Sequence, residues 1–156
     1  LSADLARRMA EKIVESVRGR KKELPLAALG LSYRAVQSYV PVVIPCSERD
    51  ALSELCLCTT IDVRRWIQLR EEDFSPAMTD FQERLRSTEQ YHAGTGMLRD
   101  AARQVTELAR RQLAVAPHFV AYAIDWELEG DQLATILREC GASADALREF
   151  QSRGWI

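Results

Sequence analysis

The chain has 156 residues, of which 47% are hydrophobic and 28% are charged, and its formal net charge is −2. This length and this proportion of hydrophobic to charged residues are typical of a globular protein that buries a hydrophobic core and needs no disulfide or metal ion to stabilise it. The slightly acidic charge argues against a protein held on DNA mainly by phosphate contacts, because such proteins are usually basic.

The charge is distributed unevenly along the chain. Residues 1–40 hold eight Lys and Arg and four Asp and Glu, a net charge of +4. The rest of the chain holds thirteen Lys and Arg and nineteen Asp and Glu, a net charge of −6. We therefore expect a single domain over residues 1–156 with a basic N-terminal subregion at 1–45.

The sequence predicts a soluble, intracellular protein. No apolar run approaches the length of a membrane-spanning helix, and Leu1 leads directly into a charged amphipathic pattern rather than a signal peptide. The four cysteines match no familiar disulfide framework, so reduced thiols in the cytoplasm are expected, with the nucleus left open.

Apolar periodicity predicts helices along nearly the whole chain. Leu5, Met9, Ile13 and Val17 are four residues apart and form one stripe on a helix. Residues 41–45 are the one segment expected to be extended. The predicted helices cover 3–18, 25–30, 33–40, a segment that begins at Ser47, 61–70, 76–90, 97–113, 117–128, 132–140 and 144–152.

Turn and cap residues separate these predicted helices. Pro76 follows an N-cap serine, "HAGTG" at 92–96 is typical of a loop, and Gly141 and Gly154 are expected to end helices. The segment 117–128 is apolar almost all round and is expected at the centre of the core. The prediction is an all-α fold, a compact bundle of about eight mostly short helices.

Residues 22–41 match part of a helix-turn-helix. Gly30 lies where the turn needs a left-handed backbone, Ser32 is suited to cap the second helix, and Val36 and Tyr39 occupy its buried positions. The segment resembles the "LGLS…V" core shared by many bacterial helix-turn-helix proteins. That resemblance implies a recognition helix at 32–40. Its DNA-contacting residues would be Lys21, Lys22, Tyr33, Arg34, Gln37 and Ser38.

Two observations weaken the DNA interpretation. Leu26 stands where a small residue is preferred, and Pro25 shortens the first helix. Residues 137–151 have the same layout, with Gly141 in the turn and Ser143 as the cap, but the second helix there is acidic. The shared pattern therefore favours a general way of joining two short helices.

The other candidate sites are weaker. Cys56 and Cys58 are two residues apart, a spacing that points side chains to opposite sides of a helix, so no metal site is expected. The segments 93–96 and 125–131 are interpreted as an interhelical loop and a solvated acidic helix end. Arg64, Arg65 and Trp66 are the candidate partner-binding residues, because Arg beside Trp is common at interaction hot spots.

The sequence contains no recognisable nucleophile, catalytic dyad or metal set, so neither enzyme activity nor a cofactor is expected. The favoured function is a helical protein–protein interaction or regulatory domain, whose partner the sequence does not identify. The alternative is a DNA-binding regulator that uses residues 22–41. No membrane partner is expected, and a homo-oligomer is compatible with the sequence.

Overall fold

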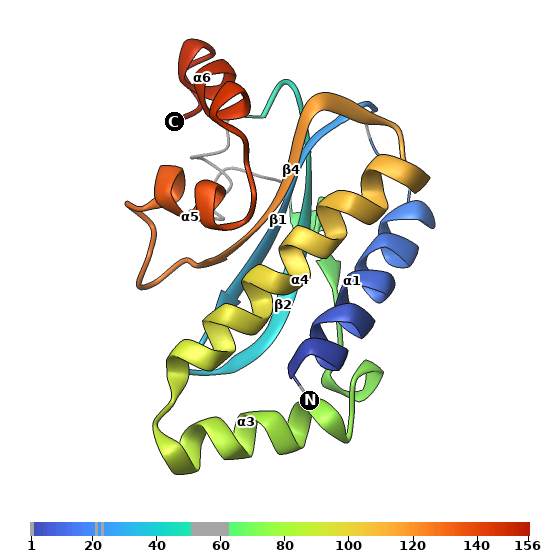
Figure 1. The fold of residues 1–156 in the computed structure, drawn as a ribbon. Coiled ribbons are helices and arrows are strands. Elements are labelled where there is room, and N and C mark those ends of the chain that lie inside the picture. The colour runs from blue at the N-terminus through green and yellow to red at the C-terminus, as the bar shows by residue number, and fades with distance from the viewer. Residues whose placement is uncertain (1, 21, 23, 51–62) are drawn as a thin grey trace.

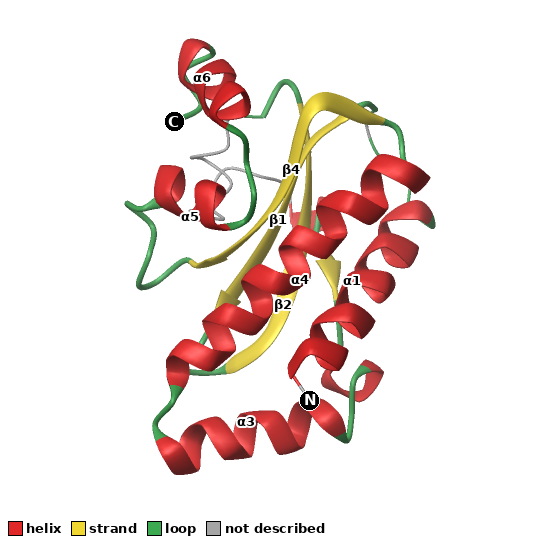
Figure 2. Cartoon of the chain, viewed as in Figure 1, coloured by secondary structure: helices red, strands yellow, loops and turns green. Residues whose placement is uncertain are grey.

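A computed structural model describes residues 2–20, 22, 24–50 and 63–156. Within these ranges the chain forms five α-helices and a four-stranded mixed sheet, so the prediction of an all-α bundle is wrong (Figures 1 and 2). The helix that was expected to begin at Ser47 falls largely outside the described residues, as do Cys56 and Cys58.

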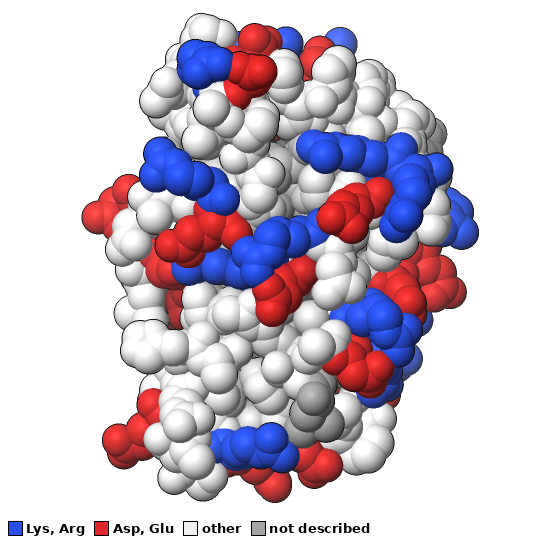
Figure 3. Space-filling view, viewed as in Figure 1, with Lys and Arg blue, Asp and Glu red and all other residues white. Residues whose placement is uncertain are grey.

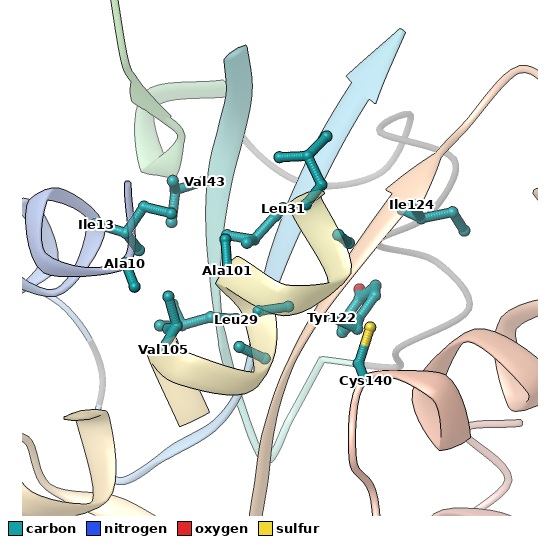
Figure 4. Close-up of a cluster of buried hydrophobic side chains, with 14 of the residues drawn as sticks. Ala10, Ile13, Leu29, Leu31, Val43, Ala101, Val105, Tyr122, Ile124 and Cys140 are labelled. Carbon is teal, nitrogen blue, oxygen red and sulfur yellow. The ribbon is translucent and has the colours of Figure 1, made fainter. Parts of the chain in front are cut away.

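Helices α1 (Ser2–Arg18) and α4 (Tyr91–Gln112) lie side by side on one face of the sheet (Figure 1). The stripe predicted for α1 is buried as expected. Ile13 from α1 and Val105 from α4 meet Leu29 and Leu31 of the sheet in the main core (Figure 4). Burying such aliphatic side chains stabilises the fold by roughly 1.5–3 kcal/mol each.

The sheet has the strand order β3-β2-β1-β4. Strands β1 (Leu26–Arg34) and β2 (Ser38–Ser47) form an antiparallel hairpin, and β4 (Val115–Asp125) pairs in parallel with β1. Strand β3 (Ile67–Gln68) pairs with β2 at Val42 and Val43.

The helices predicted at 25–30, 33–40 and 117–128 are therefore wrong, and with them the helix-turn-helix at 22–41. Strands β1 and β4 are covered on both faces, so their sequences are continuous apolar runs. They lack the alternation of apolar and polar residues that indicates a half-exposed strand. Residues 119–125 are nevertheless buried, as expected for the core of the protein.

The second helix-turn-helix pattern does form two helices. Helix α5 (Leu133–Glu139) ends before Gly141, whose φ of 94° is the left-handed conformation that favours glycine. Helix α6 (Ala144–Ser152) is capped by Ser143, which accepts a hydrogen bond from the amide of Ala146 at 3.1 Å. The two helices contact β4 on the face opposite α4, where Cys140 lies near Tyr122 (Figure 4).

Helix α3 (Ala77–Thr88) confirms the helix predicted at 76–90, but the loop expected at 92–96 belongs to α4. Residues 63–70, expected to be helical, form a 3-10 turn (Val63–Arg65) and β3; a second 3-10 turn (Glu71–Asp73) follows. Among the helices described, none is long and apolar enough to cross a membrane.

Side chains cover the outer edge of β4. Thr106 of α4 accepts a hydrogen bond from the amide of Ala121 at 2.9 Å, and Arg110 donates to the carbonyl of Phe119 at 3.1 Å. The backbone of Ala123 hydrogen-bonds Cys140. An edge strand leaves backbone N–H and C=O groups without a neighbouring strand, and at these three positions a side chain provides the hydrogen-bond partner instead.

Candidate functional site

A cavity of about 330 Å³ lies at the end of the sheet where β1 begins and β2 ends, uppermost in Figure 1. We call this cavity the basic pocket. Four of its lining residues are cationic, and they come from two segments that are more than 40 positions apart in the sequence. It is lined by Arg20, Lys22, Leu26, Pro45, Ser47, Arg64 and Arg65.

The first two cations follow directly from the end of α1. The amide of Arg20 donates to the carbonyl of Val17 at 3.2 Å, which continues the helical path for one more turn. The guanidinium of Arg20 then reaches the carbonyl of Trp66 at 3.0 Å, and Lys22 Nζ lies 3.1 Å from the carbonyl of Arg20. These bonds tie the segment after α1 to the segment that carries Arg64 and Arg65.

Arg65 is positioned by the end of β2. It donates to Asp50 at 2.7 and 3.2 Å and to the carbonyl of Pro45 at 3.2 Å. Burial by itself would raise the pKa of Asp50, but hydrogen bonds from Arg65 and Ser47 lower that pKa below its ordinary value. Asp50 is therefore ionised at neutral pH and fixes the Arg65 guanidinium at the pocket wall.

The cationic lining of the basic pocket favours an anion. Four of the described lining residues are cations, and one of them, Arg65, pairs with the carboxylate of Asp50. Guanidinium groups present several donors in a fixed plane, which matches carboxylate and phosphate oxygens. The arrangement can hold an acidic group.

A second polar cluster lies at the opposite end of the sheet. Tyr33 donates to Thr95 at 3.2 Å, and burial raises the pKa of the Tyr33 phenol. Arg99 forms ion pairs with both Glu129 and Glu139. Because Arg99 and both carboxylates are engaged with one another, we interpret this cluster as a structural link between β1, α4 and the loop after β4.

Thiol and metal chemistry have little support in the described part of the chain. Cys46 and Cys140 are buried, and burial raises the pKa of Cys140 to about 11. The described residues contain no group of three or more His, Cys, Asp or Glu side chains that could hold a metal ion.

The structure brings together residues from both predicted sets. Arg64 and Arg65, predicted to bind a partner, share the basic pocket with Lys22, predicted to bind DNA. Trp66 contributes its carbonyl to Arg20, and its side chain is half-buried. Lys21 lies outside the described residues.

The remaining DNA-binding candidates lie at the other end of the hairpin and do not form a recognition helix. Tyr33 is 3% exposed, and Arg34 pairs with Glu127 and stacks on Trp126 at 4.9 Å. Gln37 is in the hairpin turn, and Ser38 begins β2 and donates to Gln82. Val36, expected to be buried, is 73% exposed.

Sequence reasoning did not select Arg20, Pro45 or Ser47 as site residues. The basic cluster around 18–22 was the available signal for Arg20, but the sequence does not reveal that this cluster faces residues 64–65. Comparison with family models, with curated proteins and with solved structures found no match.

Proposed function

We propose that this domain is a non-enzymatic binding module that captures an acidic segment of a partner protein in the basic pocket. The observation that carries the proposal is the convergence of Arg20, Lys22, Arg64 and Arg65 on the lining of one cavity. A carboxylate or phosphate group there would gain charge-assisted hydrogen bonds.

The charges around the pocket favour an acidic protein over nucleic acid. Binding along a phosphate backbone needs a basic tract that neutralises several phosphates. The net charge is −2, and basic and acidic side chains are interspersed over the face seen in Figure 3.

The first test measures the binding of a fluorescein-labelled glutamate-rich peptide by anisotropy at low and high salt. The double variant Arg20→Gln/Arg64→Gln should bind this peptide at least about a hundredfold more weakly, because it loses two charge-assisted hydrogen bonds of about 1.5–3 kcal/mol each. Arg65 is left intact because its loss would remove the ion-pair partner of the partly buried Asp50. Added salt should weaken wild-type binding.

Arg86→Gln is the matched control, since Arg86 is an exposed arginine on α3, at the other end of the molecule in Figure 1. It should bind like the wild type, and circular dichroism checks that all variants are folded. Equal peptide binding by the wild type and the double variant would overturn the proposal. Tighter binding of duplex DNA than of the peptide would also overturn it.

A further inference from the structure

The basic pocket is the first of three neighbouring hollows. A middle hollow of about 420 Å³ is lined by Leu24, Pro25, Ser47, Glu48 and Arg49, and it shares Ser47 with the basic pocket. A third hollow, of about 220 Å³, shares Glu48 with the middle one. Ser47 at the end of β2 and Glu48 directly after it therefore lie between three adjoining depressions at one end of the sheet.

Irregular strand pairing opens the third hollow. Leu26 pairs with Val115 and Ala28 with Val120, so β4 advances five residues while β1 advances two. A second register shift, between β1 and β2, falls at the same place. The surplus residues of β4 bulge out of the ladder, and Ala27, Ala116, Pro117 and His118 line the hollow that results.

The third hollow has an aromatic base, and we call it the aromatic pocket. Phe150 and Trp155 lie with ring centroids 5.6 Å apart, and both are almost fully buried beneath it. Arg153 stacks on Trp155 at 5.0 Å and pairs with Glu149 at 2.7 Å and Glu48 at 3.6 Å. The rim therefore holds one guanidinium and two carboxylates, and the base is suited to an apolar group.

The chemistry thus changes along the three hollows. The basic pocket is cationic, the middle hollow carries Leu24 with 56% of its surface exposed, and the aromatic pocket combines an apolar base with two carboxylates. A nucleic acid would bring phosphates toward Glu48 and Glu149, which disfavours it. A polypeptide can place unlike side chains at successive positions of one extended segment.

We propose that the three hollows form one groove for an extended peptide segment, with an acidic residue in the basic pocket and an apolar residue in the aromatic pocket. This inference rests on the proposed function, and it adds a second anchor to it. Charge complementarity fixes the acidic end of the ligand. The apolar base formed by Phe150 and Trp155 requires an apolar side chain at the other end of the ligand.

The test compares two labelled peptides, one with a glutamate cluster followed by a leucine several residues later, the other with alanine in place of that leucine. The leucine peptide should bind about tenfold more tightly, since a buried leucine side chain adds that much affinity. Leu24→Ser should weaken binding of both peptides. Val36→Ser is its matched control, because Val36 is also a large, exposed apolar side chain and lies at the other end of the hairpin.

Trp155 provides a readout that locates the apolar anchor. In the Trp66→Phe/Trp126→Phe background, Trp155 is the sole tryptophan, because the chain has three. Its fluorescence should shift on addition of the leucine peptide and stay unchanged with the alanine peptide.

The outcomes separate the two proposals. The groove would be overturned if both peptides bound with equal affinity and neither changed the Trp155 fluorescence. If binding still depended on Arg20 and Arg64, the proposed binding of an acidic peptide would stand. Absence of binding by either peptide would overturn both. A single-stranded oligonucleotide that binds more tightly than the leucine peptide and shifts Trp155 would replace the peptide as the occupant.

Discussion

Close packing at single residues decides what substitutions the core tolerates. A Cβ atom added to Gly94 in α4 would lie 2.2 Å from Cε1 of the Tyr39 ring, a distance at which the ring must move. Tyr39 also contacts Tyr33 and Phe81, so its ring has little room to yield. Gly94 lets α4 approach the start of β2.

Gly94→Ala should therefore lower the free energy of unfolding by roughly 1–3 kcal/mol, although the same change in an open helix would stabilise it. Gly96→Ala is the matched control, since its Cβ would meet nothing within 4 Å in the same helix. It should raise stability by about 0.5–1 kcal/mol. Urea unfolding of both variants checks the opposite signs, and equal shifts would contradict the packing argument.

Asp50 should give the site a pH-dependent stability. Its pKa is lowered in the folded state, so its contribution is present above the pKa of the unfolded chain and is lost as pH falls through the lower folded value. Between about pH 5 and about pH 3 the wild type should lose more free energy of unfolding than Asp50→Asn. Urea titrations at several pH values measure this, and parallel pH profiles would refute it.

At the scale of elements, the edge of β4 depends on side chains from α4. The amide of Ala121 is buried and donates a hydrogen bond to Thr106 Oγ1. A buried donor left without a partner costs about 1–3 kcal/mol. The Thr106 hydroxyl also donates to the carbonyl of Ala102 at 3.1 Å, which holds it in place on the helix.

Thr106→Val should lower the free energy of unfolding by about 1–3 kcal/mol, because valine keeps the shape of threonine and removes the acceptor. Thr106→Ser keeps the hydroxyl and should retain more of the stability than valine does. Hydrogen exchange at Ala121 gives a local readout, since that amide should exchange faster in the valine variant. Unchanged exchange there would show that the edge does not rely on this bond.

Elements with local signals could be predicted from the sequence. The stripe of α1, the proline before α3 and the caps around Gly141 and Ser143 act within one or two helical turns, and the structure contains those helices. Strands β1 and β4 were missed because both faces of each are covered, so period-2 alternation is lost. Their parallel pairing joins residues about 90 positions apart, which no local pattern reports.

At the scale of the whole molecule, the topology assembles the site from residues that the sequence separates. Arg64 and Arg65 were selected from the sequence and lie at the basic pocket. Arg34 was selected too, but the hairpin carries it to the opposite end of the sheet, where Glu127 neutralises it. The aromatic pocket was not foreseen, because it depends on register shifts between strands far apart in the chain.

The covered edge of β4 also limits how a partner can attach. Many peptide-binding domains recruit a ligand as an additional strand, which draws affinity from main-chain hydrogen bonds shared by every sequence. At Phe119, Ala121 and Ala123 those positions are already occupied by the protein's own side chains. A segment that meets this edge cannot add as a strand at these three positions, so there it must be selected by its side chains. Self-association through this edge of the sheet is disfavoured.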